Sequence, residues 1–260
     1  MRFHRVRSIG LEIWLPIALV ALWWFASAAS TSPYFPPLQS ILAQFASDWL
    51  SPAASANLLP SLAILGVGYA IALLVGIGVG LLLGTVRVLE EVTRPLLEVL
   101  RAIPGVAVLP LFVVLLGIEM PMKIALIAFG CVWPVLLNTI DGVRGIEPLL
   151  LDVARSYRIG RVRRLTSIIL RGASPQIFAG ARTALAIAII IMVVAETVGG
   201  SGGIGYFLLT AERNFAITSM WGAIIALGLL GYVLNILFRL LESVALRWHR
   251  LLQSRLEAQS

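Results

Sequence analysis

The sequence predicts an all-α membrane protein with about six transmembrane helices, because it is too apolar for a water-soluble fold. Of its 260 residues, 59% are hydrophobic and only 13% are charged, whereas a soluble domain carries roughly 25% charged residues. Several apolar stretches are long enough to cross a bilayer core, which needs about 20 residues of helix. The arginines around these stretches give them an orientation. Lipid is therefore expected to cover much of the chain.

Six apolar stretches define the expected spans within one transmembrane domain, residues 1–260. They cover residues 11–30, 59–84, 93–116, 121–140, 176–198 and 221–242. The first stretch follows three arginines and contains three tryptophans, and no small-residue cleavage site ends it. We therefore interpret it as a retained helix rather than a secretion signal.

Positive charge is concentrated on one side of the predicted membrane. Arginines precede the first span, separate the second from the third, fill the segment after the fourth and follow the sixth. The other side holds only Lys123 and Arg213. The positive-inside rule then places both termini in the cytoplasm, and the family resemblance described below implies the inner membrane of a bacterial cell. The same rule accounts for the net charge of +7, so we expect no nucleic-acid partner.

The segment between the first two spans predicts a short amphipathic helix on the outer membrane surface. After Pro37, apolar residues recur at helical spacing, and they are Leu38, Ile41, Leu42, Phe45 and Trp49. Such a helix buries one face. A structural cap over the bundle is the simpler interpretation, and part of a docking face for an external partner is the alternative.

Glycine recurs every four residues in the second span, at Gly76, Gly80 and Gly84. Small residues at this spacing let helix backbones approach closely within lipid. We therefore expect this span to pack tightly against another helix.

The third span is interrupted by Pro104, Gly105 and Pro110. Proline inside a helix removes a hydrogen bond and clashes with the preceding turn. Broken helices at membrane depth are tolerated where they are buried in protein or line a cavity. A pore-lining break and a simple packing kink both remain open.

The cytoplasmic segment 143–175 predicts an amphipathic helix of about three turns. Pro148 suits the first position of a helix, where its missing N–H costs nothing. One apolar stripe then recurs at helical spacing, and it consists of Leu150, Val153, Ala154 and Tyr157. The stripe must be buried against lipid headgroups or a groove of another protein, and periodicity does not choose between them.

The ends of this helix carry matching signals. Asp152 falls in the early turns, and Arg155 and Arg158 fall in the last, as the helix dipole favours. Gly160 lies just beyond, where a C-terminal glycine is favoured. We expect the helix to end there.

At this loop the sequence resembles the permeases of binding-protein-dependent ABC importers. Their signature reads Glu-Ala-Ala, three residues, glycine, nine residues and Ile-x-Leu-Pro. This chain carries Asp152-Val153-Ala154-Arg155-Ser156-Tyr157 and then Ile168 and Leu170. Arg158 stands at the glycine position and Arg171 at the proline position, so the geometry after the helix departs from the family's pattern.

Other segments resemble the nitrate, sulfonate, taurine and bicarbonate branch of that family. They are Leu100-Arg101-Ala102-Ile103-Pro104, Ala195-Glu196-Thr197 and Gly203-Ile204-Gly205-Tyr206. The resemblance runs from about Pro37 to Arg247 and implies a small anion as substrate. Related permeases carry vitamin precursors or aromatic acids, so these remain alternatives.

The resemblance implies both a mechanism and partners. In this family the loop helix docks in a cytoplasmic ATPase subunit, which binds ATP and Mg, and an external binding protein delivers the solute. Two permease chains, usually identical, enclose one pathway. Because the ATPase subunit binds the nucleotide, this chain itself is expected to be no enzyme and to hold no cofactor or metal. The implied coupling residues are Leu150, Asp152, Val153, Ala154, Arg155, Ser156, Tyr157 and Arg158.

Polar or helix-breaking residues within the spans are candidates for the pathway, namely Arg101, Pro104, Trp133, Asn138, Glu196 and Thr197. A deeply inserted carboxylate costs roughly 2.5–3.5 kcal/mol, so we expect Glu196 to face protein or water, either as a gate or in a structural pair. Arg101 is expected to pair with Glu98, one turn earlier, with attraction of an anion as the alternative. Asn138 has the alternative of a hydrogen bond across helices.

Two other functions compete with this interpretation. A secondary transporter that needs no ATP would give no reason for the loop helix and would usually carry inverted repeats. A membrane enzyme would need polar catalytic groups clustered at one depth, and the expected spans contain no histidine.

Overall fold

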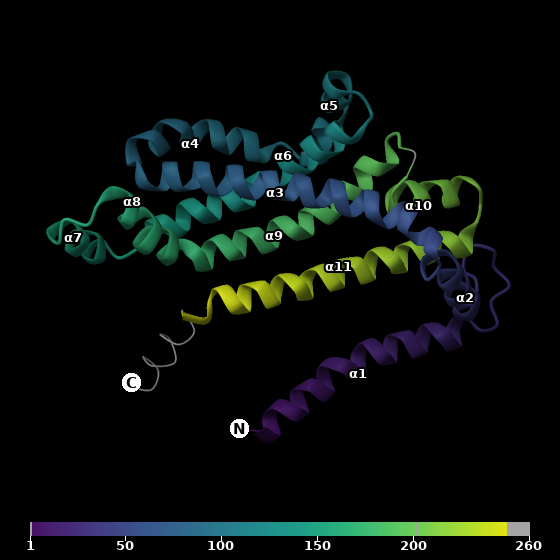
Figure 1. The fold of residues 1–260 in the computed structure, drawn as a ribbon. Helices are drawn as coiled ribbons and strands as arrows, with labels where there is room; N and C mark the ends of the chain where they lie inside the picture. The colour runs from purple at the N-terminus through teal and green to yellow at the C-terminus, as the bar shows by residue number, and fades with distance from the viewer. Residues whose placement is uncertain (1, 201, 249–260) are drawn as a thin grey trace.

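The computed structural model describes residues 2–200 and 202–248, and every regular element in these ranges is a helix (Figure 1). The longer helices are α1 (Arg2–Ser27), α3 (Ser55–Thr85), α4 (Arg87–Ala102), α6 (Met120–Arg144), α9 (Leu170–Thr197) and α11 (Ile217–Ala245). The shorter ones are α2 (Leu38–Trp49), α5 (Leu109–Leu116), α7 (Pro148–Ser156), α8 (Arg161–Arg164) and α10 (Ile204–Arg213). The all-α prediction is therefore confirmed.

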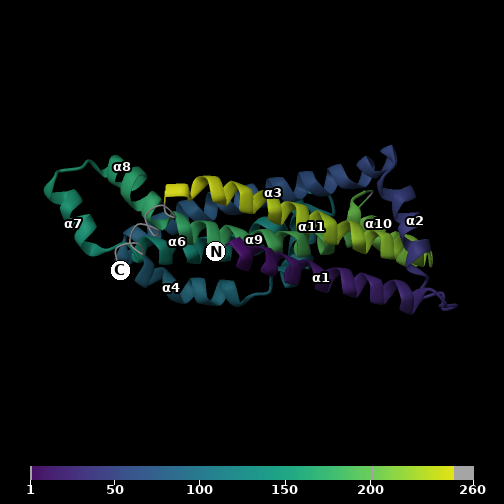
Figure 2. The same cartoon turned by 90° about the horizontal axis from the view of Figure 1, so that it is seen from below.

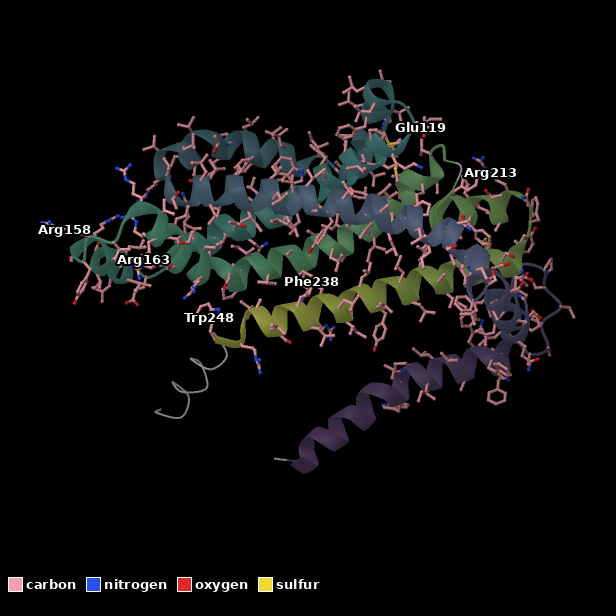
Figure 3. All side chains as sticks on the ribbon, viewed as in Figure 1. Glu119, Arg158, Arg163, Arg213, Phe238 and Trp248 are labelled. Atoms are coloured by element: carbon pink, nitrogen blue, oxygen red, sulfur yellow. The ribbon has the colours of Figure 1, made fainter. Side chains whose placement is uncertain are left out.

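Most of the long helices run along a common axis (Figures 1 and 2), with α2 and α10 at one end and α7 and α8 at the other. Figure 3 labels Arg158 and Arg163 at the α7 end, and Glu119 and Arg213 at the opposite end. The expected cytoplasmic and outer sides are thus separated by the length of the bundle.

Four described helices are long and apolar enough to cross a membrane: α3, α6, the continuous segment Arg161–Thr197, and α11. The pair formed by α4 and residues 105–116 passes the same test as one span bent by 85°. The apolar part of α1 whose side chains are described, Trp14–Ser27, is shorter. The chain is thus multi-pass, while six spans and cytoplasmic termini stay predictions.

The predicted close packing of the second span is confirmed, because α3 lies directly against α6. An added Cβ would lie 2.8 Å from the Val135 Cβ at Gly76 and 2.6 Å from the Thr139 Cβ at Gly80. Real Cβ atoms essentially never approach this closely. The full stripe of small residues on α3 comprises Gly68, Ala72, Gly76, Gly80 and Gly84. The small residues of this stripe let the two backbones reach this separation.

On its other side α6 packs against α9 just as closely. A Cβ on Gly180 of α9 would lie 2.6 Å from the Pro134 carbonyl oxygen, and one on Gly142 would lie 2.9 Å from the Ala173 oxygen. Fully buried Cys131 of α6 donates its thiol to the Ala184 carbonyl of α9 at 3.3 Å across this interface. Helix α6 is therefore the centre of the bundle.

The predicted amphipathic helix after Pro37 forms as α2. Its Leu38 and Ile41 are buried, and Trp49 packs edge-to-face on Phe207 of α10 with ring centroids 5.2 Å apart. The helix also packs across α11. These contacts support the interpretation of α2 as a cap on the bundle.

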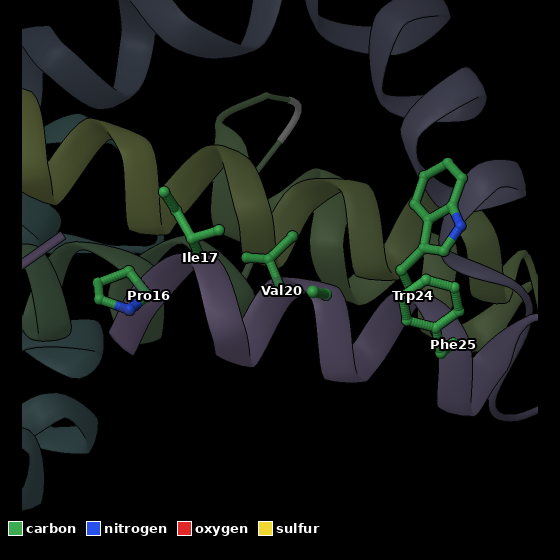
Figure 4. Close-up of a pocket in the computed structure, with 6 residues that line it drawn as sticks. Pro16, Ile17, Val20, Trp24 and Phe25 are labelled. Carbon is green, nitrogen blue, oxygen red and sulfur yellow. The ribbon is translucent and has the colours of Figure 1, made fainter. Parts of the chain in front are cut away.

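Helix α1 diverges from the rest of the bundle (Figure 1). Its contacts lie near its end, where Trp23 packs on Trp221 of α11 at 5.5 Å and the Ser27 hydroxyl accepts from the Leu38 N–H at 3.0 Å. The remaining face carries an apolar groove of about 490 Å³ (Figure 4), lined by Pro16, Ile17, Val20, Ala21, Trp24 and Phe25. Such a surface is expected of a helix that contacts lipid.

The expected break in the third span is present between α4 and α5. Residues 105–108 form a single 3₁₀ turn. A Cβ on Gly105 would lie 3.2 Å from the Gly130 Cα of α6. The break is therefore held against α6, as a broken helix within a membrane requires.

A pair of glycine substitutions tests the α3–α6 contact. Gly80→Ala should destabilise the chain by about 1–3 kcal/mol, because its methyl group overlaps Thr139. Gly78→Ala should be neutral or stabilising by up to about 1 kcal/mol, because no atom lies within 4 Å of its added Cβ and alanine favours helix. Thermal unfolding in detergent measures both, and equal midpoints would contradict the packing described.

Candidate functional site

The expected coupling helix forms as α7, with Pro148 at its first position. Its inner face is anchored to the bundle, because Ala154 is only 2% exposed and Leu151 packs against a buried cluster from neighbouring elements. The cluster consists of Val143, Ile146, Ile169, Ala173 and Ile177. Leu151 thus connects α7 to a cluster that includes residues of α6 and α9.

Within the part of the chain that the structure describes, no side chain covers the outer face of α7. Leu150 and Val153 are about half exposed, and Tyr157 is 80% exposed. Ala154, which helical spacing places on the same apolar stripe, is already buried within this chain, so it is not part of the exposed surface. Leu150, Val153 and Tyr157 form the unpartnered apolar surface, which we call the α7 outer face.

Polar residues on the same helix bond to one another. Arg155 forms an exposed ion pair with Asp152 at 2.9 Å, and the Ser156 hydroxyl donates to the Asp152 carbonyl at 3.1 Å. Exposed pairs of this kind contribute little to stability. Both charges are therefore free to exchange their bonds for contacts with a partner.

The turn after α7 depends on Arg158 rather than on Gly160. Arg158 has φ +51°, and Gly160 has an ordinary φ of −57°. The Ile159 N–H donates to the Ala154 carbonyl at 3.0 Å and the Arg158 N–H to the Arg155 carbonyl at 2.9 Å, the pattern of a Schellman C-cap. The expectation that Gly160 ends the helix is therefore wrong, and an arginine holds a left-handed conformation that favours glycine.

At the opposite end of the bundle, Glu196 joins three elements. The Ser61 hydroxyl of α3 donates to its Oε1 at 2.6 Å, and the Gly205 N–H of α10 donates to its Oε2 at 2.7 Å. The same hydroxyl accepts from the Ile204 N–H at 2.9 Å. With Glu196 only 1% exposed, these bonds support the expectation of a structural pair, and we call them the Glu196 lock.

A cavity of about 620 Å³ adjoins the Glu196 lock at the α2–α10 end of the bundle. We call it the outer pocket. Its polar side chains are Glu119, Lys123, Glu196 and Tyr206. Reasoning from the sequence did not select Lys123 as a site residue, although its position as an isolated cation on the outer side was a usable signal.

Arg101 lies toward the other end, in a smaller cavity of about 260 Å³ between α4 and α6. It does not form the expected ion pair with Glu98, although both line this cavity. Glu90 holds the cavity wall together, with ion pairs to Arg94 at 2.9 Å and Arg144 at 2.7 Å. Because Arg94 already neutralises this face of α4, Arg101 is left facing the cavity.

The remaining pathway candidates are not gathered into one site. Pro104 lies exposed at the bend after α4, and Trp133 stacks edge-to-face on Phe129 at 5.6 Å. The Asn138 side chain donates to the Pro134 carbonyl of its own helix at 2.8 Å, so the expected bond across helices is absent. Thr197 donates to the Val194 carbonyl at 2.7 Å. Their roles in a pathway stay predictions.

Comparison with known proteins matches most of the chain. The family described as "Binding-protein-dependent transport system inner membrane component" matches residues 72–245. The SsuC protein of Bacillus subtilis (strain 168), provisionally named an aliphatic sulfonates transport permease, is 31% identical over 90% of this chain and 86% of that protein. The bicarbonate transport system permease protein CmpB of Synechococcus elongatus is 35% identical over 67% of this chain and 63% of that protein.

A solved structure shares the fold. A chain from the inward-facing MetNI methionine ABC transporter superposes with a TM-score of 0.64 and 18% sequence identity. The match covers 72% of this chain and 93% of that chain. At this identity the likeness shows the helical arrangement alone.

A serine substitution tests the Glu196 lock. Ser61→Ala should destabilise the chain by about 1–3 kcal/mol, because it leaves a buried carboxylate oxygen and the Ile204 N–H without their partner. Ser55→Ala, on the same helix, is the control, since its exposed hydroxyl bonds only to the Pro52 carbonyl. Thermal unfolding in nanodiscs distinguishes them, and an unchanged midpoint for Ser61→Ala would argue against the lock.

A glycine at position 158 tests the turn after α7. Arg158→Gly should stabilise the end of the helix by about 1 kcal/mol, because a left-handed conformation costs other residues roughly 1–2 kcal/mol. Gly160→Ala should change little, since its φ is ordinary and nothing lies within 4 Å of the added Cβ. Hydrogen exchange of residues 148–160 is the measurement. Faster exchange in Arg158→Gly than in the natural chain would refute the assignment.

Proposed function

The chain belongs to the family of binding-protein-dependent transport system inner membrane components, and we propose that two copies of it enclose the pathway of an ABC importer for a small anion. As a permease subunit of such an importer, it would form the path across the membrane and would not hydrolyse ATP. ATP and Mg would be bound by a separate cytoplasmic ATPase subunit. An external binding protein would deliver the solute, expected to be a sulfonate, taurine, nitrate or bicarbonate, with a vitamin precursor or an aromatic acid as alternatives.

The observation that carries this proposal is the α7 outer face. A helix of nine residues that is anchored on one side and apolar on the other needs a partner in a groove. Its neighbours Arg155 and Arg158 add positive charge. The α7 outer face would therefore dock in a cleft of the ATPase subunit, with Asp152 and Arg155 setting its register.

The anchoring of α7 indicates how movement would pass into the membrane. The cluster on which Leu151 packs includes residues of both α6 and α9, so a displacement of α7 would act on the ends of both helices. Because α6 is packed against α3 without free space, the three helices would move as one body. Closure of two ATPase subunits would thus reach the pathway as a rigid-body motion.

Co-purification tests the docking surface. Changing Arg155 and Tyr157 together to glutamate should abolish binding of the ATPase subunit to the tagged chain, because it places negative charge on the α7 outer face. The double variant with Tyr34 and Arg213 changed to glutamate is the control, since it alters the same residue types at the opposite end of the bundle. Both variants should insert and stay folded.

Either of two results would count against the proposal. An ATPase bound equally well by both variants would move the docking surface away from α7. The absence of any bound ATPase from the natural chain, purified gently from cells that express one, would contradict the importer itself.

A further inference from the structure

Lys123 holds a buried positive charge at the edge of the outer pocket. It is the single lysine of the sequence, lies in the first turns of α6, and is only 7% exposed. Its ammonium lies so close to Gly200 that a Cβ there would be 2.7 Å from Nζ. The pocket wall is therefore shaped to admit this side chain.

Within the described residues, the ammonium has no hydrogen bond and no ion pair. The nearby Glu196 interacts with it electrostatically, but both oxygens of Glu196 are bonded to Ser61 and Gly205. Glu119 also lines the pocket but is exposed to solvent. Because the ammonium lines the outer pocket and no described side chain bonds to it there, it is available to an anion that enters this pocket.

Resting on the importer function proposed above, we infer that the outer pocket is a transient binding site for a small oxyanion, with the Lys123 ammonium as its counter-charge. The pocket has about 620 Å³, within the range of small-molecule sites. The N-terminus of α6, where Met120 lines the same pocket, adds the positive end of a helix dipole. The sulfonate, nitrate or bicarbonate group would bind at this end.

The two carboxylates explain why the site would be transient. Glu119 and Glu196 oppose an anion in the same pocket, so one ammonium holds it only weakly. A site on a transport path must bind well enough to admit the solute and weakly enough to release it. The arrangement therefore suits a stopping point on the outer half of the pathway better than a storage site.

The single lysine allows a direct test. The full chain, grown with [13Cε]lysine, carrying a lysine-free tag and placed in nanodiscs, gives one lysine side-chain resonance, that of Lys123. Ethanesulfonate, nitrate and bicarbonate are titrated against chloride at constant ionic strength. At least one oxyanion should produce a saturable shift that chloride does not reproduce. Small linear shifts, equal for all salts, would overturn the site.

A matched pair of variants gives the second readout. Lys123→Met should reduce anion uptake by the assembled importer about tenfold or more, the effect of losing one charged contact, and Lys123→Arg should restore much of it. Glu119→Gln removes a competing carboxylate from the same pocket and should lower the apparent Kd for the anion several-fold. Unchanged uptake in Lys123→Met would overturn the site even if that variant is less stable.

Retention of the ATPase separates this inference from the importer function. If Lys123→Met still co-purifies with the ATPase but the natural chain shows no specific shift, the anion site is wrong and the importer stands. If the natural chain binds no ATPase, the importer function fails. If Lys123→Met does not fold, the resonance of the natural chain still decides the question.

Discussion

The contact between α3 and α6 is the constraint on which the other features depend. Glycines of α3 lie where any side chain would overlap Val135 or Thr139 of α6, and α9 occupies the opposite side of α6 equally closely. Within lipid, where apolar surface gains nothing by leaving the solvent, such close packing is the main source of helix association. It holds α6 in the middle of the bundle, with the outer pocket beside its first turn and the coupling loop beyond its last.

Two kinds of site thus lie at the two ends of the same rigid unit. One end presents apolar side chains that residues 2–200 and 202–248 leave uncovered, and the other surrounds a carboxylate with hydrogen-bond donors from two further helices. This division is expected of a subunit that receives mechanical work on one side of a membrane and accepts solute on the other.

The sequence predicted those features that depend on local periodicity. Composition indicated the helical membrane fold, glycine spacing indicated a close helix contact, and the apolar stripe located α7. Features that depend on distant partners could not be predicted from local periodicity. Ser61 is 135 residues from Glu196, and Leu151 packs on a cluster that includes residues of α6 and α9. The sequence led us to expect that Gly160 ends the helix, because glycine is the most frequent residue in the left-handed conformation. The hydrogen bonds of this turn instead place Arg158 in that conformation.

The continuity of the segment Arg161–Thr197 has a mechanical consequence. At 1.5 Å per residue, its 37 residues form a lever roughly 55 Å long, with the coupling loop at one end and Glu196 at the other. A tilt of about 5° would carry its far end roughly 5 Å, about the width of a small oxyanion. On the proposed function, a tilt of this size by the segment together with α6 and α3 would open or close a path without a change of secondary structure.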